Sequence, residues 1–212
     1  RFFWIDGQSL DSPIGIFRLK IHLFGGNASQ VCATHALFTA IQEAVEQSLS
    51  DGFKPTLAIV FLSIAQDRKA ITQFLDTKNI AVFGATTNGE FISEDTENGS
   101  VVILLLDINK DYFKIYLEDY PEKNYREIAK GIAKKAKKEF KEPAFLISVS
   151  HLETDAEQLL FGFEDIIGKY VNVFGGMAGD DYTFSEQFVF TNGIESNIGT
   201  VVLALDEDNI KI

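Results

Sequence analysis

The sequence predicts an α/β domain in which two copies of a β-α-β-α-β-β unit form mixed sheets flanked by helices. Helical and strand patterns alternate along the chain, and segment 57–62 is apolar throughout, as in a strand covered on both faces. The tripeptide Val-Phe-Gly occurs at 82–84 and at 173–175, and a glycine-rich loop follows it each time. Two such units can pair about a pseudo-twofold axis and share one extended sheet.

The first unit begins with a strand at 17–24, where apolar and basic side chains alternate as on a half-buried strand. Apolar residues then recur at helical spacing over 28–49, and a later helix begins after Asp67, which can accept hydrogen bonds from its first backbone amides. The predicted elements are strands at 17–24, 57–62, 81–83 and 101–106 and helices at 28–49 and after Asp67.

The second unit repeats this order of elements. Thr154 and Glu157 have the spacing of a capping box, and Gly168 is a residue typical of a helix end. A lysine-rich face opposite an apolar one indicates an amphipathic helix at 124–140. The predicted elements are strands at 113–117, 145–149, 171–174, 188–190 and 201–205 and helices at 124–140 and 154–167.

The internal duplication is the most informative sequence feature, because it makes the two glycine-rich loops equivalent. We assign the repeats to residues 17–107 and 113–206 of one duplicated domain at 17–212. Residues 1–16 stay unassigned, although Phe3 and its neighbours can form an accessory strand, and 209–212 reads as the start of a further strand. The matching pairs are Lys20 and Lys114, Pro55 and Pro143, Asp67 and Asp155, Gly84 and Gly175, and Asp107 and Asp206.

Ligands of α/β proteins commonly bind where the strands of the sheet end. Both glycine-rich loops follow a predicted buried strand, and their side chains are small and polar, so they can supply hydrogen bonds without filling a pocket. The alternative is that the glycines only permit tight turns. The candidate ligand-binding residues are Ser63, Gly84, Thr86, Thr87, Asn88, Gly89, Glu90, Ser150, His151, Gly175, Gly176, Gly179, Asp180 and Asp181.

These loops also carry a family resemblance. Segment 84–90, segment 175–181 with Phe184, and the Phe-Thr-Asn-Gly run at 190–193 resemble the N-terminal part of the FIST domain, over about residues 20–212. The resemblance implies a sensory domain of an intracellular signal-transduction protein that binds a small polar molecule, such as an amino acid. It also implies a C-terminal companion domain or signalling module as partner, and a cytoplasmic location.

Composition argues against several other classes of protein. The chain has 212 residues and a net charge of −12, which disfavours binding to nucleic acid or to an anionic membrane surface. Its apolar runs are far shorter than the roughly 18 residues of a membrane-spanning helix. The single cysteine, Cys32, excludes an intrachain disulfide. Neither a metal site nor a cofactor is expected, since no His-x-x-x-His pair, phosphate loop or dinucleotide fingerprint is present.

Two alternatives to a sensor stay open. Ser150, His151 and Asp180 are residues that a hydrolase or transferase could use, although their sequence positions do not bring them together. A protein-interaction scaffold is the other alternative. We expect no catalytic activity.

Two further expectations concern stability. By the duplication, Phe83 and Phe174 should be buried in equivalent environments. Thr87, Asn88 and Asp180 are expected to be loop residues whose replacement leaves folding nearly unchanged.

Overall fold

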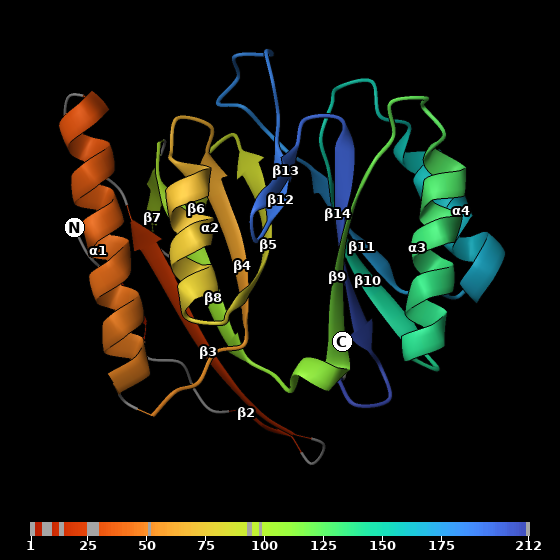
Figure 1. Cartoon of the computed structure of the whole chain (residues 1–212), viewed down its shortest axis with the longest axis horizontal. Coiled ribbons are helices and arrows are strands. Elements are labelled where there is room, and N and C mark those ends of the chain that lie inside the picture. The colour runs from red at the N-terminus through yellow and green to blue at the C-terminus, as the bar shows by residue number, and fades with distance from the viewer. Residues whose placement is uncertain are drawn as a thin grey trace.

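The polypeptide forms four layers, in which two sheets face each other and each carries two helices on its outer side (Figure 1). This mixed α/β architecture is the predicted fold class, but the helices flank two separate sheets and not the single extended sheet that we considered. The computed structural model describes residues 3–5, 10–12, 15–24, 30–50, 52–92, 95–97 and 99–210, with side chains for 38–49, 52–90 and 99–210.

The first sheet has β3 near one end and a hairpin from the second half of the chain at the other. Its strand order is β1 (Phe3–Ile5), β3 (Gly15–Phe24), β8 (Val101–Asp107), β4 (Leu57–Ser63), β5 (Ala81–Thr87), β12 (Val189–Thr191) and β13 (Ile194–Ser196), and β2 (Leu10–Ser12) also pairs with β3. Helices α1 (Gln30–Ser50) and α2 (Arg68–Thr77) cover its outer face, while β6 (Glu90–Ile92) and β7 (Asp95–Glu97) form a separate hairpin. The accessory strand expected near Phe3 is therefore present as β1.

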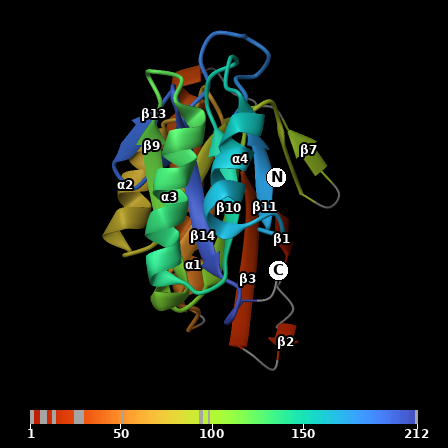
Figure 2. The same ribbon diagram turned by 90° about the vertical axis from the view of Figure 1, so that its right-hand side faces the viewer.

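The second sheet has four strands, in the order β11 (Val173–Met177), β10 (Pro143–Val149), β14 (Gly199–Asp206) and β9 (Phe113–Asp119). A short 3₁₀ helix, η1 (Lys110–Tyr112), precedes β9. Helices α3 (Tyr125–Glu139) and α4 (Ala156–Ile167) lie side by side on its outer face (Figure 2).

The two sheets share one pattern of strand pairing. The order β3-β8-β4-β5 in the first corresponds to β9-β14-β10-β11 in the second, with a parallel final pair in both. The registers agree with the matched pairs except Pro55 and Pro143, because the row that ends at the glycine of Val-Phe-Gly aligns Val60 with Ile147, one position off the spacing of that proline pair. The internal duplication itself stays a prediction. The two rows are His22, Ile103, Val60 and Gly84, and Tyr116, Val202, Ile147 and Gly175.

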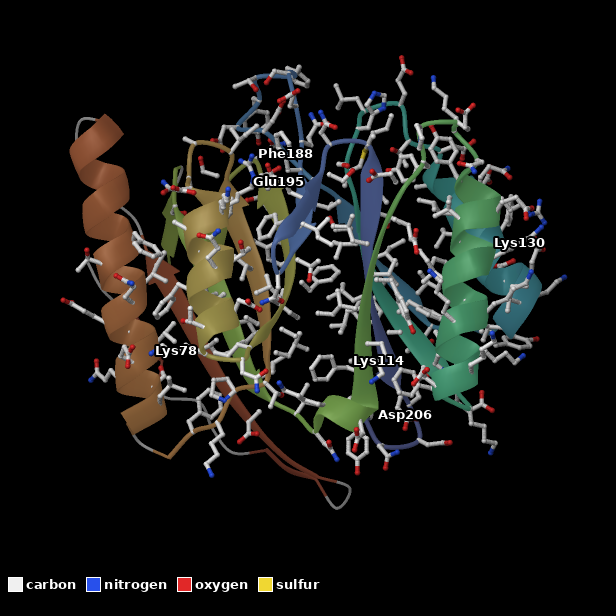
Figure 3. All side chains as sticks on the ribbon, viewed as in Figure 1. Lys78, Lys114, Lys130, Phe188, Glu195 and Asp206 are labelled. Carbon is white, nitrogen blue, oxygen red and sulfur yellow. The ribbon has the colours of Figure 1, made fainter. Side chains whose placement is uncertain are left out.

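Apolar side chains fill three layers of core between the four structural layers (Figure 3). One core lies between α1, α2 and the first sheet, and a second lies between α3, α4 and the second sheet. The third joins the two sheets and includes Leu57, Phe83, Phe113 and Leu203. Burying each such side chain contributes roughly 1.5–3 kcal/mol, so the contact between sheets is a major part of the stability of the fold.

The helix ends agree with the sequence analysis at Asp67 and Gly168 but not at Thr154. Asp67 caps α2 by accepting a hydrogen bond from Ala70 N, and Gly168 ends α4. The cap of α4 is Asp155, which accepts from Gln158 N at 3.1 Å, so the predicted capping box is wrong by one residue. Thr154 instead donates its hydroxyl to Ser150 O, a bond that competes with capping.

Other expectations fall at the edge of the described chain. Residues 209–210 lie in a turn and bend after β14 and not in a strand, while 211–212 are outside the described residues. The side chains of His22, Cys32 and His35 are also outside the described set.

The prediction for Phe174 is wrong. Phe83 is fully buried between the sheets, whereas Phe174 is 42% exposed. The cause is the position of the strands: β5 lies between β4 and β12, but β11 has β10 as its sole neighbour among the described strands and ends its sheet. The same Val-Phe-Gly tripeptide therefore lies in the interior of one sheet and at the edge of the other.

Candidate ligand site at the junction of the two loops

The two glycine-rich segments meet in space, although about ninety positions separate them in the sequence. Gly179 N donates to Thr86 O at 2.7 Å, and the Thr86 hydroxyl donates to Gly179 O at 2.5 Å. The Asn88 side chain accepts from Asp180 N at 2.8 Å. We call this meeting point, formed by residues 84–90, 178–181 and Ser63, the loop junction. Much of the first segment is strand and not loop, because β5 continues to Thr87 and β6 begins at Glu90.

Asp181 is the side chain at the loop junction with unused hydrogen-bonding capacity. Ser63 donates its hydroxyl to Asp181 Oδ2 at 2.5 Å, which connects the end of β4 to the second loop. The other oxygen, Oδ1, is buried and has no hydrogen-bond partner among the described residues. A buried carboxylate oxygen without a donor is costly. The backbone of Asp181 is also in the left-handed region, with φ of 54°.

Glu90 faces the same region but is fully engaged. Its carboxylate is buried and accepts hydrogen bonds from the Thr87 hydroxyl and from the amide and hydroxyl of Ser100. These bonds hold the start of β6 against the start of β8. The arrangement suits a structural brace better than a ligand contact.

Asp180 also organises the second loop. Its side chain is 2% exposed and accepts from Ser185 N at 2.7 Å and from Gln187 Nε2 at 3.2 Å. Burial by itself raises the pKa of this carboxyl. The carboxylate also accepts hydrogen bonds from Ser185, Thr183, the Phe184 amide and Gln187, and their combined effect is larger than that of burial. The pKa of Asp180 therefore lies below its usual value. Asp180 is therefore held as a carboxylate by the loop itself.

Close packing accounts for three of the predicted glycines: Gly84, Gly179 and also Gly175, where a β-carbon would lie 1.8 Å from Ile147 O. A β-carbon on Gly84 would lie 2.0 Å from the Phe190 ring, and one on Gly179 would lie 2.5 Å from Asn88 Oδ1. Gly89 has a φ of 135°, a conformation that favours glycine. Gly175 and Gly176 are placed elsewhere, on the exposed edge strand β11.

Ser150 and His151 belong to different surroundings. The Ser150 hydroxyl is buried and exchanges hydrogen bonds with the backbone of Gly199, at 2.9 and 3.1 Å. His151 Nδ1 accepts from Glu153 N at 3.3 Å, and the ring lines a depression of about 460 Å³ with Gln187. Because Ser150 and Asp180 are bonded to other groups, the geometry does not favour the hydrolase or transferase alternative.

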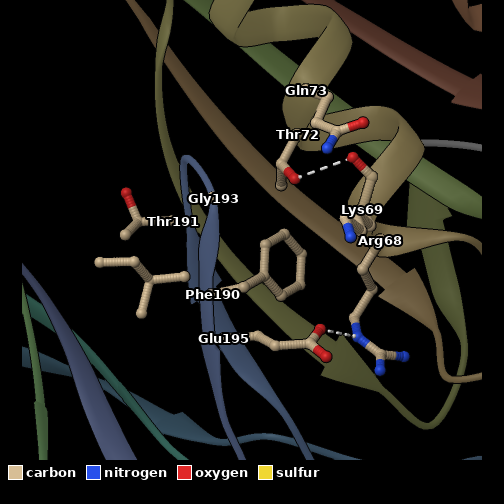
Figure 4. A pocket seen from close by; sticks show the side chains of 9 residues that line it. Arg68, Lys69, Thr72, Gln73, Phe190, Thr191, Gly193 and Glu195 are labelled. Carbon is tan, nitrogen blue, oxygen red and sulfur yellow. Dashed lines mark hydrogen bonds and ion pairs between the residues drawn. The ribbon is translucent and has the colours of Figure 1, made fainter.

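A second depression, of about 260 Å³, was not foreseen from the sequence. It lies between α2 and the β12–β13 hairpin, and the Phe190 ring forms part of its wall (Figure 4). At its rim, Arg68 Nε is 2.8 Å from Glu195 Oε2, and the guanidinium lies 4.1 Å from the centre of the Phe188 ring. No sequence signal pairs Arg68 with a hairpin so distant in the chain.

A comparison with protein families covers the part of the chain that contains both loops. The family model for the FIST N domain matches residues 56–212, and the chain belongs to this family. FIST domains are sensory domains of signal-transduction proteins. No curated protein matches the sequence.

Two kinds of feature are absent from the described residues. Within the ranges given above, no helix combines the length and apolarity required to cross a bilayer. The same residues contain no group of three or more His, Cys, Asp or Glu side chains arranged to hold a metal ion.

Proposed function

We propose that the chain is the ligand-binding part of a sensory protein and that it binds a small polar molecule at the loop junction without transforming it. The observation that supports this most directly is the buried and unpartnered Oδ1 of Asp181. Ser63 orients the carboxylate from the opposite strand end. A ligand that donates a hydrogen bond to Oδ1 relieves the cost of leaving this oxygen unpaired.

The chemistry of Asp181 favours a ligand with an ammonium or amide group. Hydrogen bonds between charged donors and carboxylates are roughly twice as strong as neutral ones. An amino acid carries such a donor, which is in line with the sequence-based expectation. The interlocked bonds among Thr86, Asn88 and Gly179 fix the surroundings before the ligand arrives, which reduces the ordering cost of binding.

The proposal places the domain in an intracellular pathway with a C-terminal companion or signalling module as its partner. The effect of ligand binding then passes through the loop junction, because this region joins the two sheets. The bonds between Thr86 and Gly179 are the direct connection through which such a change reaches both halves.

A thermal-shift screen of amino acids, dicarboxylates and nucleotides tests the proposal. A ligand at 100 times its Kd stabilises the folded state by about 2.7 kcal/mol, which raises the Tm of a domain of this size by roughly 5–10 °C. If none of these classes raises the Tm, the proposed function is wrong.

The location of the site is tested with Asp181→Asn, which keeps the size of the side chain and removes its charge. Titration calorimetry should show at least a tenfold loss of affinity for a ligand found in the screen. The matched control is Asp111→Asn on the exposed η1 helix, which should bind as the unmodified chain does. Equal affinity in the Asp181 variant would place the site away from the loop junction.

A further inference from the structure

No strand of the described residues pairs with the outer edge of β11, although the corresponding edge of β5 is covered. On β5, the amides that point away from β4 are bonded: Val82 N to the Asn192 side chain and Thr86 N to Phe188 O. Gly84 lies between them, opposite Phe190 of β12. β12 and β13 therefore close this end of the first sheet.

The registers identify the equivalent groups on β11. Val173, Gly175 and Met177 occupy the positions of Val82, Gly84 and Thr86 and alternate with residues whose amides face β10. β10 is the sole neighbour of β11 among the described strands, and β11 ends the second sheet (Figure 2). Unpaired edges of this kind are ready templates for an added strand, and proteins usually protect them.

The space between β5 and α2 that the Phe190 ring fills, which we call the Phe190 seat, has an equivalent on the second sheet. Phe190 lies over Gly84 beside Arg68 and Thr72 of α2. Aligning the caps Asp67 and Asp155 places Ala156 and Leu160 of α4 at the positions of those two residues.

On the second sheet, Ala156 and Leu160 line a groove of about 230 Å³ together with Gly175. Within the part of the chain whose side chains are described, no aromatic side chain from a further strand fills this groove. The walls of this groove are more apolar than those of the Phe190 seat, because Ala156 and Leu160 stand where the first sheet has Arg68 and Thr72.

The groove walls are exposed to an extent unusual for such side chains. Leu160 is 39% exposed and Met177 is 49% exposed, and both lie beside the half-exposed Phe174. Contiguous apolar surface on a strand edge indicates an interaction site.

Charge indicates the kind of occupant. Exposed Asp155 and Glu157 flank the groove residue Ala156, and Glu207 is hydrogen-bonded to Asn172 at the start of β11. The chain as a whole carries a net charge of −12, so a second copy is repelled and a basic partner is attracted.

We propose that the β11 edge binds an extended, basic segment of a partner protein as an added antiparallel strand, with an aromatic side chain of that segment seated over Gly175. The added strand bonds to the outward backbone groups of Val173, Gly175 and Met177. Its aromatic ring fills the groove between β11 and α4 as Phe190 fills the seat between β5 and α2. Basic residues flanking the ring face the acidic groups beside the groove.

The probe is a fluorescent peptide with the sequence of residues 187–196, carrying Glu195→Lys and two additional lysines at its end. It contains the natural strand with Phe190 but has a basic charge. Fluorescence anisotropy should show saturable binding that weakens as salt is added. A peptide that also carries Phe190→Ala should bind at least tenfold more weakly.

Two variants of the protein test the location of binding. Leu160→Lys and Met177→Lys should each weaken binding at least tenfold, because they place like charge and polar atoms in the groove. Leu152→Lys is the matched control, since Leu152 is an exposed apolar residue outside the groove, and its affinity should be unchanged. Thermal melts establish that all three variants are folded.

Amide hydrogen exchange tests the mode of binding. Saturating peptide should slow exchange at Val173, Gly175 and Met177, while Thr86, already bonded, should not change. Unchanged exchange at the three β11 amides, or equal affinity in the groove variants, would overturn the proposal. Sedimentation showing that the chain dimerises through β11 without peptide would also overturn it, because the occupant would then be a second copy.

Discussion

The ring of Phe190 lies directly over Gly84, so close that a β-carbon at Gly84 would be 2.0 Å from the ring. The two residues are paired across β12 and β5, and Phe190 is 1% exposed. This contact joins the second half of the chain to the core of the first half. It also makes glycine necessary at position 84 for a reason of packing and not of backbone conformation.

Gly84→Ala should therefore destabilise the fold by about 1–3 kcal/mol, the usual cost of overpacking a core. The matched control is Gly176→Ala, because a β-carbon there meets no atom within 4 Å. That change should stay within about 0.5 kcal/mol. Urea denaturation of both variants measures the difference, and similar midpoints would show that Phe190 moves aside at little cost.

Asp180→Asn should destabilise the fold, contrary to the expectation that loop residues such as Asp180 are dispensable. The substitution weakens the hydrogen bonds that Ser185 N and Gln187 Nε2 donate to the side chain at position 180. Weakening such bonds in a buried site lowers the free energy of unfolding by about 1–3 kcal/mol. Asn88→Ala should have a similar effect, because the Asn88 side chain accepts from the amides of Asp180 and Tyr182.

The effect of Asp180 should depend on pH. Its folded pKa lies below the ordinary value of about 3.9, so the carboxylate stabilises the fold fully above that pH. This contribution is lost as pH falls through the folded pKa. The difference in Tm between the unmodified chain and Asp180→Asn should therefore be constant near neutrality and shrink below about pH 4. A difference that grows on acidification would contradict the lowered pKa.

Tyr120→Phe should destabilise the second half of the domain by about 1–3 kcal/mol. The Tyr120 hydroxyl is 2.7 Å from the carbonyl oxygens of both Ser150 and Gly199, and burial raises its pKa. Phenylalanine at position 120 has no hydroxyl, so the carbonyl oxygens of Ser150 and Gly199 lose this hydrogen-bond donor. Tyr170→Phe is the control, since Tyr170 is 99% exposed, and chemical denaturation should detect no change there.

The ion pair between Arg126 and Asp165 should be visible by NMR titration. Arg126 donates two hydrogen bonds to the carboxylate, at 2.7 and 2.8 Å, and these, with a smaller effect of Lys130 at 3.2 Å, lower the pKa of Asp165 to about 2. The stabilisation is therefore present above about pH 3.9 and lost as pH falls through about 2. In Arg126→Gln the Asp165 resonance should titrate closer to the ordinary range, and an unchanged midpoint would rule out the arginine as the cause.

The sequence patterns predicted the local elements well because local chemistry determines them. Asp67 and Gly168 mark helix ends through hydrogen bonds and backbone angles within a few residues. The placement of both glycine segments at or near strand ends also follows from local patterns, but their contact through Thr86 and Gly179 does not.

Long-range pairing could not be predicted in the same way. Nothing in the two identical Val-Phe-Gly segments indicates that Phe190 covers Gly84 while Gly175 stays open. That difference depends on where β12 lies, which requires a contact between distant residues. The contact between Ser63 and Asp181, which spans 118 positions, is determined by the same assembly of the two sheets.

The pairing of β12 with β5 has a consequence for synthesis of the protein. β5 is made long before residues 189–191, and at about 5–20 residues per second the ribosome takes on the order of ten seconds to supply them. During this interval the edge of β5 has no β12 to pair with, and no Phe190 ring covers Gly84. A fragment that stops before β12 should therefore aggregate instead of folding as an independent half.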